Sequence, residues 1–502
     1  MSKKTYLLGC DIGSSSVKAV ILNADTGKPA SSALAPESEM KIHAPQKGWA
    51  EQNPGTWWNH LITSVHIAMK QADALPDDIA AIGITYQMHG LVIVDKKQSV
   101  LRPSIIWCDS RAADIGRRAF EKIGPEYCLE HYLNSPGNFT ASKLKWVKDN
   151  EPDLYEQIHK VMLPGDYIGM RMTGTLSTTL TGLSEGILWD FPENRTAHVL
   201  MKHYGIPEAL LPKALPSFEL HGELTGSAAL ELGLKKGTPI TYKAGDQPNN
   251  AFSLNVLHPG EVAATAGTSG VIYGVTDKPM YDQKSRVNTF IHVNSREGQP
   301  MNGVLLCVNG TGILNSWLKH NMSHTHNGSL NYDEINRLAL EVPIGSDGLI
   351  TLPFGNGSER ILENRDVGAQ ILNLNFNRHN NSHLFRSAQE GIVFALNYGF
   401  QIMHEMGLNP ETVKAGRANM FQSPIFREAF VNTTGTVLEL YKTDGAEGAA
   451  RGAGIGSEIY ANETEAFMGL EKLEVIEPDA ELMKMYNEHY ERWLAELNQF
   501  LT

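Results

Sequence analysis

Two stretches of the chain, about half its length apart, share a pattern of strand, small-residue turn and strand. The first is "LLGCDIGSSSVKAVIL" (residues 7–22) and the second is "GEVAATAGTSGVIYGVT" (residues 260–276). Each places glycine and hydroxyl residues between two runs of strand formers, which is typical of a β-hairpin. A repeat at this spacing indicates a domain duplication and not a solenoid. We therefore predict two related domains that face each other, residues 1–244 and 245–502.

Between the two hairpins the sequence predicts alternating strands and helices. An Asn-Pro pair at residues 53–54 precedes an amphipathic helix, whose apolar residues recur at helical spacing: Trp57, Leu61, Val65 and Met69. We expect strands near 79–85, 91–95 and 104–107, and helices near 112–122, 142–149 and 152–159. Strands interleaved with helices indicate an α/β architecture.

The composition is that of an ordinary soluble protein, with 502 residues, 42% hydrophobic and 20% charged. No apolar run reaches the roughly 18 residues of a membrane span, and no signal-peptide pattern is present, so we expect a cytoplasmic protein without a membrane partner. The net charge of -13 argues against nucleic acid as a partner, although a nucleotide site can be locally positive. The spacings of the four cysteines match no zinc site or disulfide framework, so we expect reduced and mostly buried thiols.

The first hairpin tip has the residues of a phosphate-binding turn. Gly13 lets the backbone turn tightly, and the N–H groups and hydroxyls of Ser14 and Ser15 can cradle anionic oxygens. Asp11 ends the strand and could face a magnesium ion that bridges phosphates. Lys18 could reach a transferred phosphoryl group. No Gly-Lys-Ser/Thr sequence follows, so this is not a Walker loop. A Gly-Ser turn without a ligand is the alternative.

Two further glycine-rich elements match a nucleotide held between domains. Gly267 and Thr268 form the second hairpin tip, and a nucleoside triphosphate in a cleft needs a phosphate loop from each side. The third element is "TDGAEGAARGAGIG" (residues 443–456), whose small residues allow close approach of a helix and of a flat ligand such as adenine. The alternatives are two unrelated turns and tight helix packing.

An aspartate lies at the predicted domain joint. Asp246 in "YKAGDQPNNA" follows a predicted strand and precedes a helix. Phosphoryl transfer to an alcohol needs a positioned base near the hydroxyl, and an acid in a cleft suits that role. An ordinary helix cap is the alternative.

The stretch "GITYQMHGLVIVD" (residues 83–95) interrupts strand formers with a polar turn. Gln87, Met88 and His89 are presented at this turn. Methionine offers an adaptable apolar surface, and histidine offers a hydrogen bond to a hydroxyl. The alternative is a plain hairpin tip with a structural histidine.

Taken in order along nearly the whole chain, these motifs resemble the FGGY carbohydrate kinases of the actin-like ATPase superfamily. The segments that carry the resemblance are "CDIGSSSVKAVIL", "YQMHGLVIVDKKQSVLRPSIIWCDSRA", "NFTASKLKWVKDNEPDLYEQIHKVMLPGDYI", "AGDQPNNA", "GTSGVIYGV", "GSER" (residues 357–360) and "DGAEGAARGAG". The resemblance implies two actin-like, ribonuclease H-like ATPase domains, with mixed sheets flanked by helices and a catalytic cleft between them.

The resemblance also implies the reaction. It implies ATP-dependent phosphorylation of the terminal hydroxyl of an open-chain ketose. The Gln-Met-His-Gly segment favours D-xylulose, with D-xylulose 5-phosphate as the product. Kinases for ribulose, fuculose, gluconate or glycerol are alternatives, and a glycerol kinase would carry Arg-Glu in place of Met88-His89. A remoter alternative is an actin-like nucleotide switch without sugar chemistry.

Individual residue roles follow from the matched motifs. Asp246 matches the catalytic base and lies at the substrate. The substrate side also includes Gln87, Met88 and His89 and the Trp-x-Asp-x-Arg pattern of Trp107, Asp109 and Arg111. The nucleotide side comprises Asp11, Gly13, Ser14, Ser15, Lys18, Gly267, Thr268, Gly312, Ser316, Gly416 and Asn419. The implied cofactors are ATP and Mg²⁺, with Asp11 and Asp246 as metal-side residues. Family members often form homodimers, which the resemblance suggests as the assembly of this chain.

The sequence departs from the family pattern at four places. Tyr86 stands where many xylulose-phosphorylating members have glycine, and Cys108 replaces a common asparagine. Residues 414–417 read Lys-Ala-Gly-Arg where Gly-Gly-Gly-Ala is usual, and Ile-Leu follows "GSER" where Thr-Pro is usual. At Tyr86 the phenol either narrows the choice of sugar or packs beneath the loop.

Overall fold

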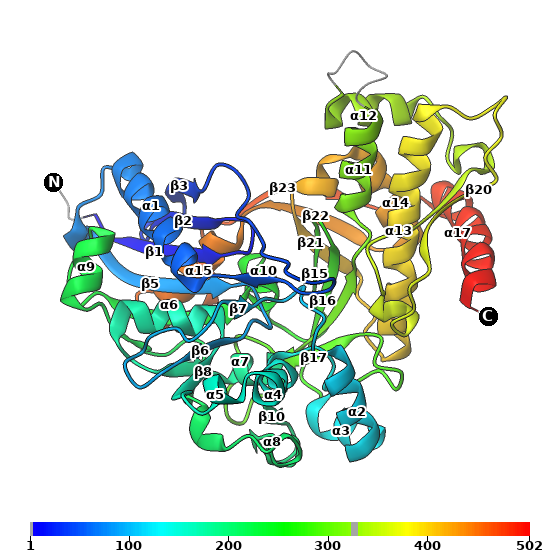
Figure 1. The fold of residues 1–502 in the computed structure, drawn as a ribbon. Coiled ribbons are helices and arrows are strands. Elements are labelled where there is room, and N and C mark those ends of the chain that lie inside the picture. Colours follow the sequence, from blue (N-terminus) through cyan, green and yellow to red (C-terminus); the bar gives the residue numbers. More distant parts are fainter. Residues whose placement is uncertain (1–3, 323–329, 502) are drawn as a thin grey trace.

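The fold consists of two halves, each built on a mixed β-sheet (Figure 1). The computed structural model describes residues 4–322 and 330–501. The N-terminal sheet has the order β13-β14-β5-β1-β2-β3, and the C-terminal sheet has the order β17-β18-β16-β15-β21-β22-β23. The strands of the first are β1 (Tyr6–Ile12), β2 (Val17–Asn23), β3 (Pro29–Ala35), β5 (Ile79–Tyr86), β13 (Gly222–Glu223) and β14 (Pro239–Gly245). Those of the second are β15 (Val262–Ala266), β16 (Gly270–Thr276), β17 (Asn288–Ile291), β18 (Asn302–Val308), β21 (Thr412–Gly416), β22 (Val437–Lys442) and β23 (Glu471–Ile476).

The two sheets repeat one topology. In the N-terminal sheet β1, β2 and β3 pair antiparallel in series, while β5 and then β14 run parallel to β1. In the C-terminal sheet β15, β16 and β18 form the same meander, and β21 and β22 add in parallel. The two predicted hairpins are therefore the first two strands of each sheet. The predicted two-domain α/β fold is confirmed.

One face of the N-terminal sheet is covered by helices of its own half. Alternate side chains of β1 (Leu8, Cys10 and Ile12) join a buried cluster with α1 (Pro54–Ala72), α6 (Pro164–Thr173) and α9 (Gly226–Leu232). Helix α1 begins as expected, because the Asn53 side chain accepts a hydrogen bond of 2.9 Å from the Gly55 amide.

The opposite face of this sheet is covered by a helix from the far end of the chain, α15 (Gly445–Gly456) (Figure 1). A Cβ atom on Gly9 or on Gly83 would lie 1.9 Å from the carbonyl oxygens of Ala446 and Ala449, respectively. The expected close approach of a helix at residues 443–456 is thus correct. The small residues of α15 allow this helix to pack closely on the sheet. Tight helix packing was the alternative to an adenine site in the sequence analysis.

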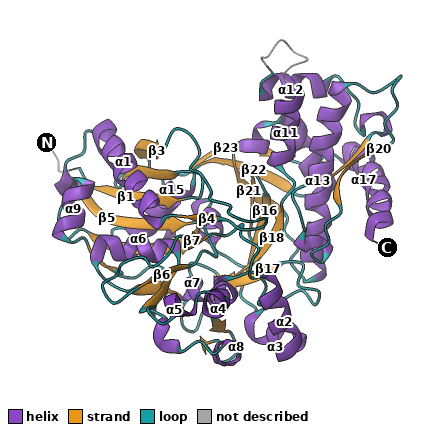
Figure 2. Cartoon of the chain, viewed as in Figure 1, coloured by secondary structure: helices purple, strands orange, loops and turns teal. Residues whose placement is uncertain are grey.

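The C-terminal sheet packs on both faces. The helices α13 (Asn381–Glu405), α14 (Pro424–Thr434) and α17 (Ala480–Leu501) cover one face. The other face packs against a helical segment inserted between β5 and β14, whose helices include α2 (Ala113–Ile123), α3 (Pro125–Tyr132), α4 (Thr140–Asn150), α7 (Leu180–Glu185) and α8 (His198–Tyr204). Figure 2 shows these helices gathered below β17. The inserted segment thereby reaches the C-terminal half and closes one side of the joint.

Smaller elements complete the chain. They are β4 (Glu51–Gln52), β8 (Lys160–Met162), β9 (Ser177–Thr179), β10 (Trp189–Asp190), β11 (Arg195–Thr196), β12 (Lys213–Leu215), β19 (Ile350–Phe354), β20 (Gly368–Leu372), α10 (Asp246–Ser253), α11 (Gly312–Met322), α12 (Tyr332–Leu340) and α16 (Glu463–Ala466). The single turns η1 (Pro76–Asp78), η2 (Glu208–Leu210), η4 (Ser346–Gly348), η5 (Arg360–Leu362) and η6 (Asn419–Gln422) are 3₁₀ helices.

Several predicted elements are shorter than expected. The strands near 91–95 and 104–107 are β6 (Val92–Val94) and β7 (Ser104–Ile105), and the helix near 152–159 is α5 (Pro152–Tyr155). The helix ends early because β8 pairs with β6 and needs the chain extended from Lys160. Of the four thiols, which are all free, Cys10 and Cys128 are buried and Cys108 is exposed. Within residues 4–322 and 330–501, no helix is long and apolar enough to span a bilayer.

Candidate active site

Three aspartates converge where the two halves meet. Asp11 lies at the end of β1, Asp246 begins α10, and Asp444 caps α15. A Cβ atom on Gly445 would lie 2.6 Å from Asp11 Oδ2. Burial, Asp246 and Asp444 raise the pKa of Asp11 to about 7. Burial raises the pKa of Asp246 to about 7 as well, against the opposing effect of hydrogen bonds from Gln247. Negative charge at this joint is thus poorly compensated by the protein.

Lys18 supplies the cation of this cluster. Its ammonium group forms an ion pair with the carboxylate of Asp444, and both side chains are partly exposed. Asp444 also accepts a 3.0 Å hydrogen bond from the Glu447 amide at the start of α15. The sequence predicted a phosphoryl-directed role for Lys18 but did not predict its pairing with Asp444, which follows it by more than 400 residues. The structure places the lysine at the joint and ties it to the helix cap.

The first phosphate turn is attached to the sugar-side segment. The Gly13 amide donates to the Ser16 carbonyl at 3.0 Å, which closes the turn. Ser14 accepts two hydrogen bonds, one on its carbonyl from Gln52 at 2.7 Å and one on its hydroxyl from the Trp107 indole at 3.2 Å. Ser15 is exposed at the tip. Trp107, which is 43% exposed, therefore lies between the predicted phosphate turn and the predicted sugar site.

The second tip docks on the start of α11. The amides of Gly312 and Ile313 donate to the carbonyls of Gly267 and Thr268 at 2.9 and 3.1 Å. A Cβ atom on Gly267 would lie 3.5 Å from the Asn419 amide nitrogen. The two remaining predicted nucleotide-side residues follow or precede these positions by a few residues. Gly416 ends β21, three positions before Asn419, and Ser316 is exposed on α11, four positions after Gly312. Residues from three distant segments thus meet at one place.

Met88 packs against the residue that precedes Asp246, and His89 follows it in the same turn. A Cβ atom on Gly245 would be 2.6 Å from Met88 Cγ, so the chain before Asp246 runs against this side chain. The Nδ1–H of His89 donates to the Glu185 carbonyl at 3.0 Å, and the ring lies edge-on to Phe139 at 4.8 Å. Burial and Lys143 lower the pKa of His89 to about 3. The ring is therefore neutral with its proton on Nδ1, which leaves Nε2 as a hydrogen-bond acceptor.

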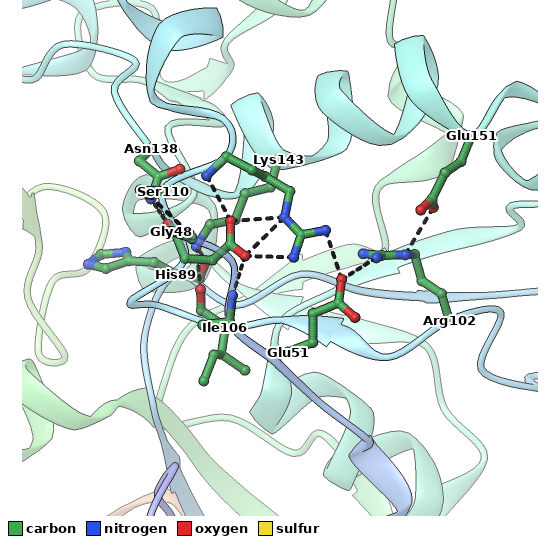
Figure 3. A network of polar contacts seen from close by, with 12 residues as sticks. Gly48, Glu51, His89, Arg102, Ile106, Ser110, Asn138, Lys143 and Glu151 are labelled. Atoms are coloured by element: carbon green, nitrogen blue, oxygen red, sulfur yellow. Dashed lines mark hydrogen bonds and ion pairs between the residues drawn. The ribbon is translucent and has the colours of Figure 1, made fainter. Parts of the chain in front are cut away.

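Lys143 on α4 holds the two sugar-side turns together (Figure 3). Its Nζ donates to the carbonyls of His89 at 2.8 Å and of Ile106 at 3.0 Å, and the side chain is fully buried. Burial lowers its pKa to about 8. Sequence reasoning missed this residue, because a lysine on a predicted helix is usually a solvated side chain.

The Trp-x-Asp-x-Arg pattern shapes the same loop. Asp109 is fully buried, and its carboxylate accepts hydrogen bonds from Arg111 at 2.7 Å and from the Ala50 amide at 2.6 Å. Arg111 stacks on Trp49 at 3.8 Å and pairs with Glu51. Figure 3 shows that Glu51 continues this network to Arg102 and Glu151. The carboxylate of Asp109, predicted to contact substrate, is thus occupied by protein groups, because the buried guanidinium of Arg111 needs an anion.

The remaining predicted substrate residue is also internal. The side chain of Gln87 is buried, with 2% exposure, and its backbone N–H donates to the Ile12 carbonyl at 2.9 Å. This bond joins the end of β5 to the predicted first phosphate turn. Tyr86 is fully buried, and a Cβ atom on Gly165 would lie 2.0 Å from its ring. The phenol therefore packs beneath the loop, against the start of α6.

A buried glutamate beside Asp246 was not predicted. Glu185 is 1% exposed, and its Oε2 would lie 2.5 Å from a Cβ atom on Gly245. Its Oε1 has no hydrogen-bond partner within the described residues. Burial, Asp246 and Asp166 raise its pKa well above the usual range. Its sequence neighbourhood contains no motif, so only the fold brings it to the site.

The acidic joint fits a divalent cation bound together with phosphates. Among the residues that the structure describes, no group of three or more His, Cys, Asp or Glu side chains forms a metal site by itself. Magnesium is commonly held by one or two carboxylates and by the phosphates of a substrate. The uncompensated carboxylates of Asp11 and Asp246 match that demand.

Comparisons with known proteins agree with this geometry. The N-terminal domain profile of the FGGY family of carbohydrate kinases matches residues 6–253, and the C-terminal domain profile matches residues 262–455. The chain belongs to this family. It is an ATP-dependent carbohydrate kinase.

Individual relatives extend the comparison. The kinase is 28% identical to the xylulose kinase of Haemophilus influenzae, over 98% of this chain and 99% of that protein. Among solved structures, the xylulose kinase of Rhodospirillum rubrum superposes with a TM-score of 0.85 at 23% identity, over 99% of both chains. The gluconate kinase of Lactobacillus acidophilus superposes with a TM-score of 0.88 at 20% identity, also over 99% of both chains. The structural likeness shows the shared fold.

Proposed function

We propose that this kinase transfers the γ-phosphoryl group of ATP to the terminal hydroxyl of an open-chain ketose, with D-xylulose as substrate and D-xylulose 5-phosphate as product. The observation that carries the proposal is the contact between the Met88 turn and the residue before Asp246. It sets a candidate base against a surface that combines an apolar side chain with the hydrogen-bond acceptor of His89. Such a surface suits the carbon face and hydroxyls of a sugar.

In this proposal each hairpin tip faces the phosphates of ATP. Gly13 and Ser14 would bind from the N-terminal half, and Gly267 and Thr268 from the C-terminal half, with Gly312, Ser316, Gly416 and Asn419 toward the nucleoside. The exposed N–H groups of such turns bind anionic oxygens. Asp11 and Asp246 would hold a Mg²⁺ ion, which neutralises phosphate charge when bound.

Asp246 would act as the general base. Its carboxylate would accept the proton of the sugar hydroxyl as that oxygen attacks the phosphorus, and the bond from the phosphorus to the ADP oxygen breaks. An alcohol is a far weaker acid than a carboxylic acid, so the proton moves late, within the transition state. The pKa of about 7 makes Asp246 more basic than an exposed aspartate while it stays largely ionised above neutral pH. Closure of the halves would exclude water and limit ATP hydrolysis.

Two observations favour D-xylulose over other acceptors. The chain carries Gln-Met-His-Gly at the sugar turn and lacks the Arg-Glu pair expected for glycerol. The relatives of similar length include proteins named xylulose kinase. Kinases for ribulose, fuculose or gluconate are the nearest competing assignments. A nucleotide switch without sugar chemistry would need neither the turn at Met88 nor an acid beside it.

A coupled ADP-release assay with a panel of ketoses, polyols and aldonates tests the proposal. D-Xylulose is expected to give the highest kcat/KM, and ATP turnover without sugar is expected to be slow. Asp246→Ala should abolish sugar-dependent turnover while ATP binding largely survives. Asp153→Ala, which removes an exposed acid on α5, serves as the matched control. Near-normal turnover of Asp246→Ala removes Asp246 as the base, and ATPase activity indifferent to every sugar favours the switch.

A further inference from the structure

Arg360 reaches from the C-terminal half to the aromatic ring beside His89. It is the first residue of η5, within the "GSER" motif. Its guanidinium carbon lies 5.5 Å from the centre of the Phe139 ring, which itself lies edge-on to His89. A Cβ atom on Gly137 would lie 3.4 Å from Arg360 Nη2. The sugar side of the joint is therefore built by both halves of the chain.

The charge of Arg360 has no protein counter-ion. Within residues 4–322 and 330–501, no carboxylate lies within ion-pair distance of its guanidinium, in contrast to Arg111 and Arg386. Its one protein hydrogen bond is long, 3.4 Å from Nη1 to the Ser285 carbonyl. Burial lowers its pKa to about 10. A guanidinium has five N–H donors and no acceptor, so this partly buried side chain keeps unused donors.

The backbone of Arg360 is fixed by its neighbour. Glu359 is fully buried, and its carboxylate accepts hydrogen bonds from the amides of Asn309 at 3.0 Å and Gly310 at 3.2 Å. These amides belong to the turn that leads into Gly312 on the predicted nucleotide side. A rigid anchor of this kind holds the guanidinium in position before a ligand arrives.

The donors and acceptors around Phe139 match the functional groups of a ketose. The carbonyl oxygen of an open-chain ketose only accepts hydrogen bonds, whereas each hydroxyl also donates. His89 Nε2 is an acceptor and suits a hydroxyl, and Arg360 is a donor only and suits the carbonyl. We propose that Arg360 donates a hydrogen bond to the ketose carbonyl and thereby selects ketoses over the alditols that lack it. This inference rests on the proposed sugar kinase function.

The test compares a ketose with its reduced form. The KM for D-xylulose and the inhibition constant of xylitol, in which a hydroxyl replaces the carbonyl, are measured for the wild type, Arg360→Met and Arg360→Lys. Arg365→Met, which removes an exposed arginine after the same turn, is the matched control. Thermal melting identifies variants that fail to fold.

The wild type should bind D-xylulose about tenfold more tightly than xylitol, because the hydroxyl of xylitol can accept from Arg360 but also brings a hydrogen for which the guanidinium, a donor only, offers no acceptor. In Arg360→Met the KM for D-xylulose should rise at least tenfold with the KM for ATP unchanged, and the ketose-to-alditol ratio should approach one. Arg360→Lys should recover part of the ratio.

A wild-type ketose-to-alditol ratio together with an unchanged sugar KM in Arg360→Met overturns the inference. If the methionine variant fails to fold, the same two results in a folded Arg360→Lys overturn it. A fall in kcat at constant sugar KM also overturns it and assigns the guanidinium to the transferred phosphoryl group. These failures are distinct from failure of the proposed function, in which the wild type itself phosphorylates no ketose.

Discussion

Gly245→Ala tests whether the joint between β14 and α10 positions Asp246, the proposed catalytic base. The added methyl group would lie 2.5 Å from Glu185 Oε2 and 2.6 Å from Met88 Cγ. Ordinary contacts of this kind are about 3.5 Å or longer, so each neighbour, or the glycine itself, must move by about 1 Å. Glu185 and Met88 are 1% and 3% exposed and have no solvent to move into. The displacement therefore falls on the backbone of Asp246 and on the Met88 turn.

The magnitude follows from these contacts. Overpacking of this kind costs about 1–3 kcal/mol of folding free energy. A misplacement of about 1 Å in a catalytic group costs about 10²-fold in rate, equivalent to about 2.7 kcal/mol. We therefore expect Gly245→Ala to lower kcat about 100-fold with D-xylulose, while the KM for ATP stays within about twofold, because the three atoms nearest to the added methyl group belong to Glu185 and Met88 and none to the nucleotide-side turns.

The assay is ADP release under saturating ATP, with melting temperature as a parallel measurement. Gly226→Ala is the matched control, since its added methyl group would lie 3.8 Å from Lys236 and in ordinary contact. The control should keep wild-type kinetics. A Gly245→Ala enzyme with normal kcat and a normal sugar KM would show that this joint does not set the position of Asp246, and the reasoning from contact to rate would be wrong.

Four further perturbations have defined outcomes. Lys143→Met removes the donor to the His89 carbonyl, at about 1–3 kcal/mol, and one of two donors to the Ile106 carbonyl, which keeps its bond from the Asp109 amide, so the melting temperature should fall and the KM for sugar should rise more than that for ATP; an unchanged sugar KM would contradict the positioning role. His89→Ala should raise the KM for sugar more than the KM for ATP, and the opposite pattern would remove His89 from the sugar site. The kcat/KM for sugar should rise with pH as Asp246 ionises, because only the ionised carboxylate accepts a proton, and a Mg²⁺ ion beside it should move the midpoint below the pKa of about 7 of the ligand-free enzyme; a rate that falls as the pH rises through this range would contradict the role of base. Since folding raises this pKa from 3.8 to about 7, the ionised carboxylate destabilises the folded state as pH rises across that interval, so Asp246→Asn should raise the melting temperature of the ligand-free enzyme above pH 7, and much less near pH 4.

The sequence predicts the features that are encoded locally. Gly13 and Gly267 lie between strand formers, so both hairpins and the duplicated topology could be read from the chain. Asp246 follows a strand and begins a helix, as expected. These signals depend on residues a few positions apart.

The features that the sequence did not predict depend on distant pairs. Asp444 meets Lys18 across 426 positions, and Arg360 meets Phe139 only because η5 and the inserted segment fold toward each other. Glu185 lies on a helix with no motif around it, and Lys143 lies in a segment that carries the family resemblance but suggested no role for it. Asp109 was predicted to contact the substrate, but its carboxylate is buried within the loop, where it forms an ion pair with Arg111, two residues later. Burial reverses the usual expectation for the charged side chains of Glu185, Lys143 and Asp109, and burial is a property of the fold.

The position of α15 also determines when the protein can fold during synthesis. One face of the N-terminal sheet depends on Ala449, Ala450 and Ala453, which pack on Leu7, Ala81 and Tyr242. The ribosome therefore completes the first sheet, whose last strand ends at Gly245, 200 residues before it reaches the helix that covers it, which begins at Gly445. Until residue 456 has emerged, that apolar face stays open to solvent or to other chains. A fragment that ends at the predicted boundary of residue 244 would lack this cover permanently, so the two halves are expected to be stable together and to aggregate apart.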